Sequence, residues 1–125
     1  MQWEYFSIDE FRCPCCGVVD IEPSFVEKLD KLRRDAGFAF IVTSGYRCAK
    51  HNQAVGGAPN SAHRLGRAAD IAIDGTQMGL LMDLRLTTDY GFYGFGISQK
   101  RQLRMLHLDD MTPSELKYRP IAWSY

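Results

Sequence analysis

The segment 61–71, Ser-Ala-His-Arg-Leu-Gly-Arg-Ala-Ala-Asp-Ile, constrains the fold more than any other part of the chain. It places His63 in a polar loop and Asp70 seven positions later, at the start of an apolar run that is typical of a buried strand. A turn at Gly66 can bring the imidazole and the carboxylate to one point. Such a pair supplies two of the three protein ligands of a catalytic zinc site. It is also common as a surface pair or as a buried hydrogen-bonded couple.

A third ligand has to come from elsewhere in the chain, and His107 is the best candidate. It lies in a strand-like run in which period-two alternation places Met105, His107 and Asp109 on one face. Two imidazoles and one carboxylate suit zinc and leave one position for water, whose pKa zinc lowers to about 7. A single histidine in an apolar strand is more often a hydrogen-bonded core residue. The prediction of a zinc site therefore depends on the complete set.

Predicted helices and strands interleave along the rest of the chain. The best helix is 23–37, which has an apolar stripe, proline in its first turn and glycine just past its end. We expect a short helix at 47–55 and a third helix capped by Thr76. The predicted strands are 38–44, 68–73, 90–97 and 103–108, with a polar turn at 99–102. Because the last two strands form a hairpin, we predict an α+β fold with a small, mostly antiparallel sheet and helices on one side.

Length and charge narrow the classes of function. A chain of 125 residues is long enough for one domain with a single core, so we expect one domain over 1–125. Within it, 1–20 form a cysteine-containing arm held to the body by Phe6, Ile8 and Phe11. The 15 basic and 15 acidic side chains cancel, which removes the basic surface typical of nucleic-acid or anionic-membrane binding. No membrane span and no signal peptide are visible. We therefore expect a protein made in the cytoplasm, which another factor must release to reach an external substrate. For its oligomeric state, a monomer is the default expectation.

The four cysteines, Cys13, Cys15, Cys16 and Cys48, allow three interpretations. They are reduced, mostly buried thiols that pack a loop. Alternatively, one of the cluster forms a late disulfide with Cys48, since a chain without a signal peptide is not oxidised during synthesis. The third interpretation is a structural zinc site, for which Cys-x-Cys-Cys is an unusual spacing. A zinc module of that kind for nucleic acid has no support from the neutral charge.

The pattern from Thr43, Thr-Ser-Gly-Tyr-Arg-Cys-x-x-His-Asn-x-x-Val-Gly-Gly-x-x-x-Ser-x-His-x-x-Gly-x-Ala-x-Asp-Ile, closely resembles the M15 zinc peptidases. Gly-Phe-Gly-Ile at 94–97 and Leu-His-Leu-Asp at 106–109 resemble the last two core strands of that family. Glu-Phe-x-Cys at 10–13 resembles its small phage and bacterial branch. The family includes D-alanyl-D-alanine carboxypeptidases and dipeptidases, and endolysins that cut L-alanyl-D-glutamate bonds.

The resemblance implies a D-Ala-D-Ala carboxypeptidase or hedgehog-like fold and a zinc peptidase that hydrolyses an amide bond in peptidoglycan stem peptides. His63, Asp70 and His107 would hold one catalytic zinc ion. Arg47 would bind the substrate and stabilise the developing oxyanion. Ser61 would contact the substrate, although it is equally well explained as a turn residue that caps its own backbone. Action on the cell wall, as in phage lysis, is also implied.

One departure from the family pattern concerns the general base. Many members carry Glu or Asp three residues before the last zinc histidine, or a second His two residues before it. Here those positions hold Arg104 and Met105, neither of which can accept a proton. Asp109 remains: it acts as the base, or it orients His107 or Arg47. The alternative function is a wall-binding or structural module that keeps the zinc site without turnover.

Overall fold

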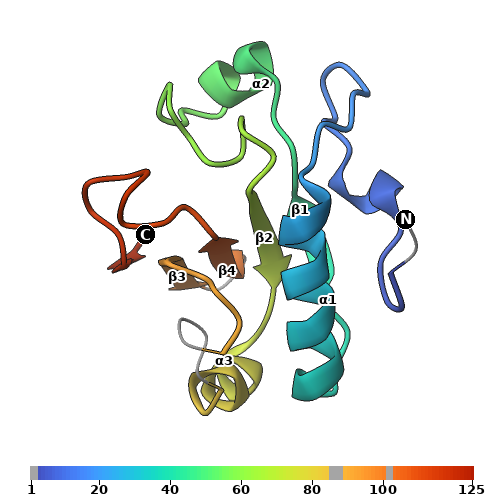
Figure 1. The fold of residues 1–125 in the computed structure, drawn as a ribbon, viewed down its shortest axis with the longest axis vertical. Helices are drawn as coiled ribbons and strands as arrows, with labels where there is room; N and C mark the ends of the chain where they lie inside the picture. The colour runs from blue at the N-terminus through green and yellow to red at the C-terminus, as the bar shows by residue number, and fades with distance from the viewer. Residues whose placement is uncertain (1–2, 85–88, 101–102) are drawn as a thin grey trace.

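The computed structural model of the chain describes residues 3–84, 89–100 and 103–125. Figure 1 shows its elements, which include three α-helices, a short 3₁₀ helix and five strands within these ranges. In chain order they are η1 (Ile8–Phe11), α1 (Pro23–Ala36), β1 (Ile41–Ser44), α2 (Ala49–Ala54), β2 (Ala68–Ala72), α3 (Gly75–Met82), β3 (Gly94–Lys100), β4 (Leu103–Asp109) and β5 (Ile121–Ser124).

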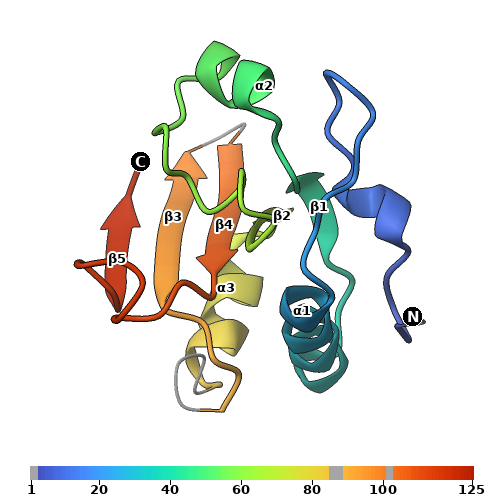
Figure 2. The ribbon, with the colours of Figure 1, turned by 45° about the horizontal axis from the view of Figure 1, so that its top comes forward.

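The five strands form one mixed sheet in the order β1-β2-β4-β3-β5, which Figure 2 shows from edge to edge. All neighbouring pairs are antiparallel except β3 and β5, which run parallel. This arrangement confirms the predicted small α+β fold with a mostly antiparallel sheet. The predicted hairpin of β3 and β4 is present, although 101–102 of its predicted turn lie outside the described residues. The edge strand β5 was not predicted. It has only four residues and is largely exposed, so it shows no apolar alternation.

Helix α1 forms where the sequence predicts it. Pro23 occupies the first turn, and the backbone of Gly37 closes the helix with a φ of 79°, a left-handed conformation that glycine adopts without a steric penalty. Helix α3 begins two residues earlier than predicted. Its cap is Asp74 and not Thr76, because the Asp74 carboxylate accepts the Gln77 N–H at 2.8 Å while the Gln77 side chain accepts the Asp74 N–H at 3.0 Å.

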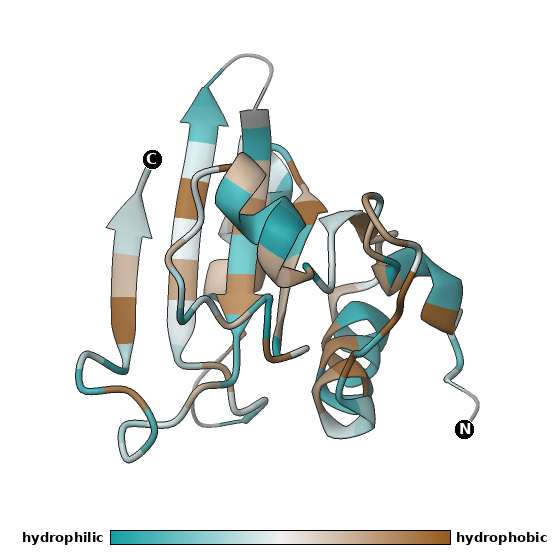
Figure 3. Cartoon of the chain, turned by 90° about the horizontal axis from the view of Figure 1, so that it is seen from above, coloured by the Kyte–Doolittle hydropathy of each residue, from teal (hydrophilic) through white to brown (hydrophobic). Residues whose placement is uncertain are grey.

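The sheet has one apolar face and one functional face. On β2 and β4, Ile71 and Leu106 are cross-strand partners and are fully buried. They share one hydrophobic core with residues of α1 and α3, so these two helices cover the same face of the sheet. Phe95 and Ile97 of β3 pack against that core, and the alternation of brown and pale bands along β3 in Figure 3 follows this pattern. The residues between them point to the opposite face, which is the functional face.

The N-terminal arm is attached to this core by two aromatic side chains. Phe6 and Phe11 are buried in the main core, with their ring centroids 5.4 Å apart. Ile8, which we expected to share this role, is 46% exposed because the 3₁₀ turn directs it to solvent. No helix among the described residues is both long and apolar enough to cross a membrane.

Candidate active site

Strand register brings two of the predicted ligands together. Asp70 of β2 and His107 of β4 are direct cross-strand partners on the functional face of the sheet, and His63 reaches them from the loop before β2. The His107 Nδ1 atom lies 3.0 Å from Asp70 Oδ1 and 3.2 Å from His63 Nε2. The third side of the triangle, from His63 Nε2 to Asp70 Oδ1, is 3.3 Å. All three residues are buried, at 2–6% exposure.

The triangle has the dimensions of a zinc site. Tetrahedral zinc with bonds of about 2.0–2.1 Å to nitrogen and oxygen separates its ligand atoms by about 3.3 Å. The three sides of the observed triangle are 3.0–3.3 Å. Two imidazoles and one carboxylate also match the donor set of zinc sites that keep a position for water or substrate. The residues present therefore fit a catalytic zinc ion.

The remaining ring nitrogen of each histidine is held by an acceptor. The His63 Nδ1 donates to the carbonyl oxygen of Gly45 at 2.7 Å, and a carbonyl can only accept. The His107 Nε2 donates to Asp109 Oδ2 at 2.9 Å. In neutral rings, these bonds select the tautomers whose His63 Nε2 and His107 Nδ1 lone pairs are available to a metal, whereas protonated rings donate from the same two atoms to Asp70. Such outer bonds are how proteins orient metal-binding histidines and raise their basicity.

The electrostatics of the site keep both carboxylates charged. Burial by itself raises the pKa of Asp70, but the hydrogen bonds from His107 and His63 outweigh it and hold that pKa well below its usual range. Burial likewise raises the pKa of Asp109, and the bonds from His107 and Arg119 reverse the shift. For His107, burial lowers the pKa, and the bonds to Asp109 and Asp70 raise it above its ordinary value.

Arg47 lies beside the triangle, between β1 and α2. Its Nε donates to Ser44 Oγ at 3.1 Å, while its two outer nitrogens make longer contacts, at 3.4 Å to Asp70 Oδ2 and 3.5 Å to Asn52 Oδ1. Contacts of that length are weak. The guanidinium is therefore oriented at its base, and its outer N–H groups remain available to a ligand.

A cavity of about 750 Å³ opens over these residues. This volume is within the range of small-ligand sites, which is about 300–1,000 Å³. All six residues that we singled out for metal, substrate or catalytic roles line it: Arg47, Ser61, His63, Asp70, His107 and Asp109. Aromatic side chains of the C-terminal segment, Tyr118, Trp123 and Tyr125, line it as well. Ser61 also accepts the His63 N–H at 3.2 Å, so it has the turn contact that we considered for it.

A family model described as peptidase M15 matches residues 4–109 of the chain. This chain belongs to the peptidase M15 family. The curated proteins with which the chain was also compared contain no match. The family consists of metallopeptidases, and the match spans every residue of the ligand triangle. It ends before the C-terminal segment that carries Arg119 and β5.

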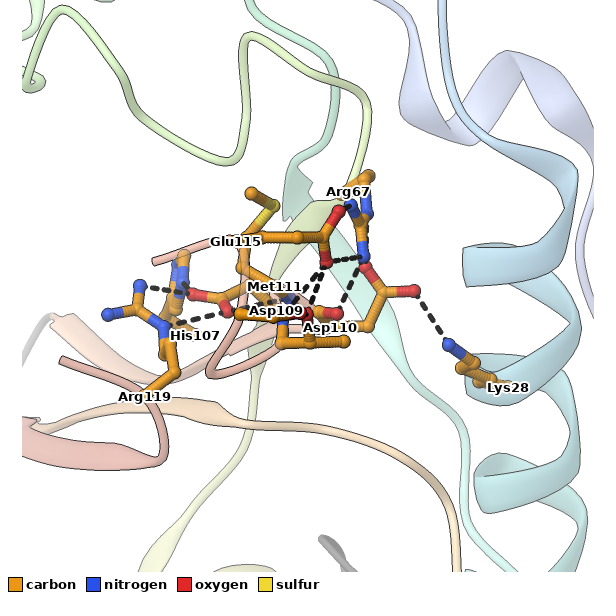
Figure 4. A network of polar contacts seen from close by, with 10 residues as sticks. Lys28, Arg67, His107, Asp109, Asp110, Met111, Glu115 and Arg119 are labelled. Carbon is orange, nitrogen blue, oxygen red and sulfur yellow. Dashed lines mark hydrogen bonds and ion pairs between the residues drawn. The ribbon is translucent and has the colours of Figure 1, made fainter. Parts of the chain in front are cut away.

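In this M15 peptidase, Asp109 makes contacts that the sequence does not reveal. Its side chain is fully buried and accepts two hydrogen bonds from the Arg119 guanidinium (Figure 4). Nε donates to Oδ1 at 3.1 Å, and Nη2 donates to Oδ2 at 2.9 Å. The Met111 N–H approaches Oδ1 at 3.3 Å. Gly94 on β3 makes room for this group, since a Cβ at that position would lie 2.1 Å from Asp109 Oδ2. Each carboxylate oxygen therefore already has two donors.

Several residues of the M15 site escaped sequence reasoning. Arg119 and Trp123 belong to the unpredicted C-terminal segment, where the Trp123 ring lies 5.1 Å from the His107 ring. The Gly45 carbonyl is a backbone group and leaves no signal in residue type. The two positions at which many family members carry a base differ in location. Met105 lines the cavity, whereas the Arg104 side chain is exposed and is not among the lining residues.

Proposed function

We propose that this M15 peptidase is zinc-dependent and hydrolyses an amide bond in peptidoglycan stem peptides, as a D-Ala-D-Ala carboxypeptidase or an L-Ala-D-Glu endopeptidase. The observation that supports it best is the triangle of His63, Asp70 and His107 in the wall of an open cavity. The proposed site of action is the bacterial cell wall. The substrate class comes from the family resemblance of the motif that begins at Thr43.

The chain's own residues have defined tasks in this proposal. His63 Nε2, Asp70 Oδ1 and His107 Nδ1 would hold the metal. When bound, zinc supplies Lewis-acid chemistry, which lowers the pKa of a water molecule and polarises a substrate carbonyl. The Gly45 carbonyl and Asp109 keep the two imidazoles in the tautomers that present their lone pairs.

Arg47 would stabilise the negative charge that develops on the substrate oxygen. Its side chain is 16% exposed and lines the cavity, so it is shielded from solvent while its outer nitrogens reach the site. A guanidinium that is already oriented toward the reaction centre stabilises an oxyanion without having to reorganise. Removing one such donor costs about 10²–10³ in kcat. Ser61 would contact the substrate peptide from the rim.

Asp109 would act as a positioning residue in this scheme. Both of its oxygens are occupied by Arg119, His107 and the Met111 N–H. The prediction that it accepts a proton stays a prediction, and the observed contacts favour the orienting role. Among the described residues that line the cavity, the other carboxylate is Asp70, a proposed ligand. An enzyme without a strong base loses a factor of about 10²–10⁴ in rate, so we expect slow turnover.

The test is digestion of purified murein of known stem peptide, with mass spectrometry of the released fragments. Zinc-loaded wild type should release D-alanine or cut between L-Ala and D-Glu. His63→Ala should abolish release, and His51→Ala serves as the matched control because it removes a histidine outside the triangle. Equal release by wild type and His63→Ala would exclude the zinc mechanism.

The occupied oxygens of Asp109 favour one further candidate, a wall-binding module that retains the metal site without turnover. Under this alternative, wild type sediments with murein but releases no fragment at any zinc concentration. Release of D-alanine or a peptide by wild type, and not by His63→Ala, would exclude it.

A further inference from the structure

All four cysteines of the chain gather at one place, away from the cavity. The sulfur atoms of Cys13, Cys16 and Cys48 lie within 4.8 Å of one another. The thiol of Cys15 is close enough to that of Cys48 to interact with it electrostatically. The interpretation that the thiols are mostly buried is wrong, since Cys13 alone is buried, Cys48 is half-buried, and Cys15 and Cys16 are exposed. All four are free thiols in the structure. Four thiols from two distant segments therefore converge without a disulfide.

The loop after η1 has the local structure of a metal-binding turn. Within Cys13-Pro14-Cys15-Cys16-Gly17, the two thiols of the cluster are separated by two residues, the spacing that favours shared binding of one ion. Gly17 closes the turn with a φ of 75°, and its N–H donates to the Cys13 carbonyl at 2.9 Å. A residue with a Cβ is strained at that φ. The turn therefore brings Cys13 and Cys16 to the same side.

Backbone N–H groups surround the Cys13 sulfur. The Cys48 N–H donates to it at 3.5 Å, and the N–H groups of Cys16 and Cys15 also point to it. The Cys48 sulfur in turn accepts the His51 N–H at 3.4 Å, at the start of α2. Such groups stabilise a thiolate, which is the form that binds metals.

We propose that Cys13, Cys16 and Cys48 hold a second, structural zinc ion, separate from the site formed by His63, Asp70 and His107. Thiolates are soft ligands that select zinc over harder cations, and structural zinc sites are closed by protein ligands. Cys15, which lies in the same loop and interacts electrostatically with Cys48, is a further thiol for the fourth position. A single disulfide would use two of these thiols and leave the others in the cluster unpaired.

This second ion would support the active site mechanically. Cys48 directly follows Arg47 in the chain, and the Tyr46 N–H donates to the Phe11 carbonyl at 2.9 Å. Zinc would therefore join the N-terminal arm to segment 45–48, which carries both Arg47 and the carbonyl that orients His63. The proposal goes beyond the peptidase function and does not depend on it.

Metal content tests the proposal on the full chain, purified under reducing conditions from zinc-supplemented cells. Elemental analysis should find two zinc ions per wild-type chain and one in Cys16→Ser, a substitution at an exposed position. The double variant His63→Ala/His107→Ala should also keep one ion. Val18→Ala, in the same loop and without a thiol, is the matched control and should keep two.

X-ray absorption on the His63→Ala/His107→Ala variant provides a second measurement that does not depend on the folding of Cys16→Ser. Its zinc should show sulfur neighbours at about 2.3 Å. A variant without zinc, or zinc with nitrogen and oxygen neighbours alone, would overturn the proposal. A disulfide between Cys48 and Cys13 or Cys16 in the reduced, zinc-supplied protein would overturn it as well. None of these outcomes bears on peptidase activity.

Discussion

Replacement of Asp109 by asparagine tests whether this carboxylate positions His107 or accepts a proton. Each carboxylate oxygen receives two donors: Oδ1 faces Arg119 Nε and the Met111 N–H, and Oδ2 faces Arg119 Nη2 and His107 Nε2. An amide has one oxygen. Whichever way it faces, its NH₂ group meets two donors, and the half-buried Arg119 charge loses its counterion.

The expected effects of Asp109→Asn follow from these contacts. Loss of an outer hydrogen-bond partner of a metal ligand costs about 10–100-fold in metal affinity, or about 1.4–2.7 kcal/mol. Breaking a buried ion pair costs about 3–5 kcal/mol of stability. Because the Arg119 side chain is 14% exposed, we expect a loss near the lower limit, about 3 kcal/mol. At saturating zinc, kcat should fall by less than tenfold.

Three measurements decide the role of Asp109. Zinc affinity is measured by competition with a chromophoric chelator, stability by urea unfolding, and kcat on a soluble stem peptide at saturating zinc. Arg104→Ala is the control, because it removes an exposed side chain from the same strand. Unchanged zinc affinity together with a fall in kcat of about 10² or more would refute the positioning role and assign the base to Asp109.

Three further substitutions test neighbouring contacts. Asp110→Asn removes a buried partner of two cations, among them Arg67 at 2.8 Å, and should lower the free energy of unfolding by about 3 kcal/mol in urea while zinc content stays unchanged; an unaltered midpoint would contradict this. Hydrogen bonding to Arg67 lowers the pKa of Glu115 to about 2, so its stabilising effect is complete above the ordinary pKa of 4.5 and is lost as the pH falls toward 2. The stability difference between wild type and Glu115→Gln should therefore close over that pH range, and a constant difference would count against the pairing. Gly94→Ala places a methyl group 2.1 Å from Asp109 Oδ2 and should weaken zinc binding at least tenfold in the chelator assay, whereas wild-type affinity would show that Asp109 is not needed there.

Adjacent carboxylates at the end of β4 illustrate how strand geometry divides roles. Asp109 points to the functional face and binds Arg119, whereas Asp110 turns to α1 and pairs with Lys28 Nζ at 2.9 Å (Figure 4). Successive residues of a strand face opposite sides. Alternation alone therefore predicts that these two acids have different neighbours, but it does not identify the neighbours.

Most of the fold could be predicted from local sequence patterns. The stripe and end signals of α1 depend on residues within one turn of each other, so they are readable without the rest of the chain. The same holds for the two faces of β4, on which His107 and Asp109 share a side. The strand β5 has four residues, three of them exposed, and no period to detect. It exists because it pairs with β3, and that contact is non-local.

The sequence by itself determined which groups are available for chemistry: two histidines and an aspartate at motif spacing, and four thiols. Only the tertiary structure decided which residues lie next to these groups. The register of β2 against β4 sets Asp70 beside His107, the chain beyond β4 brings Arg119 to Asp109, and the arm after η1 brings Cys13 to Cys48. The physical reason is that residue type and spacing encode local conformation, whereas contacts between distant segments depend on how complete elements pack.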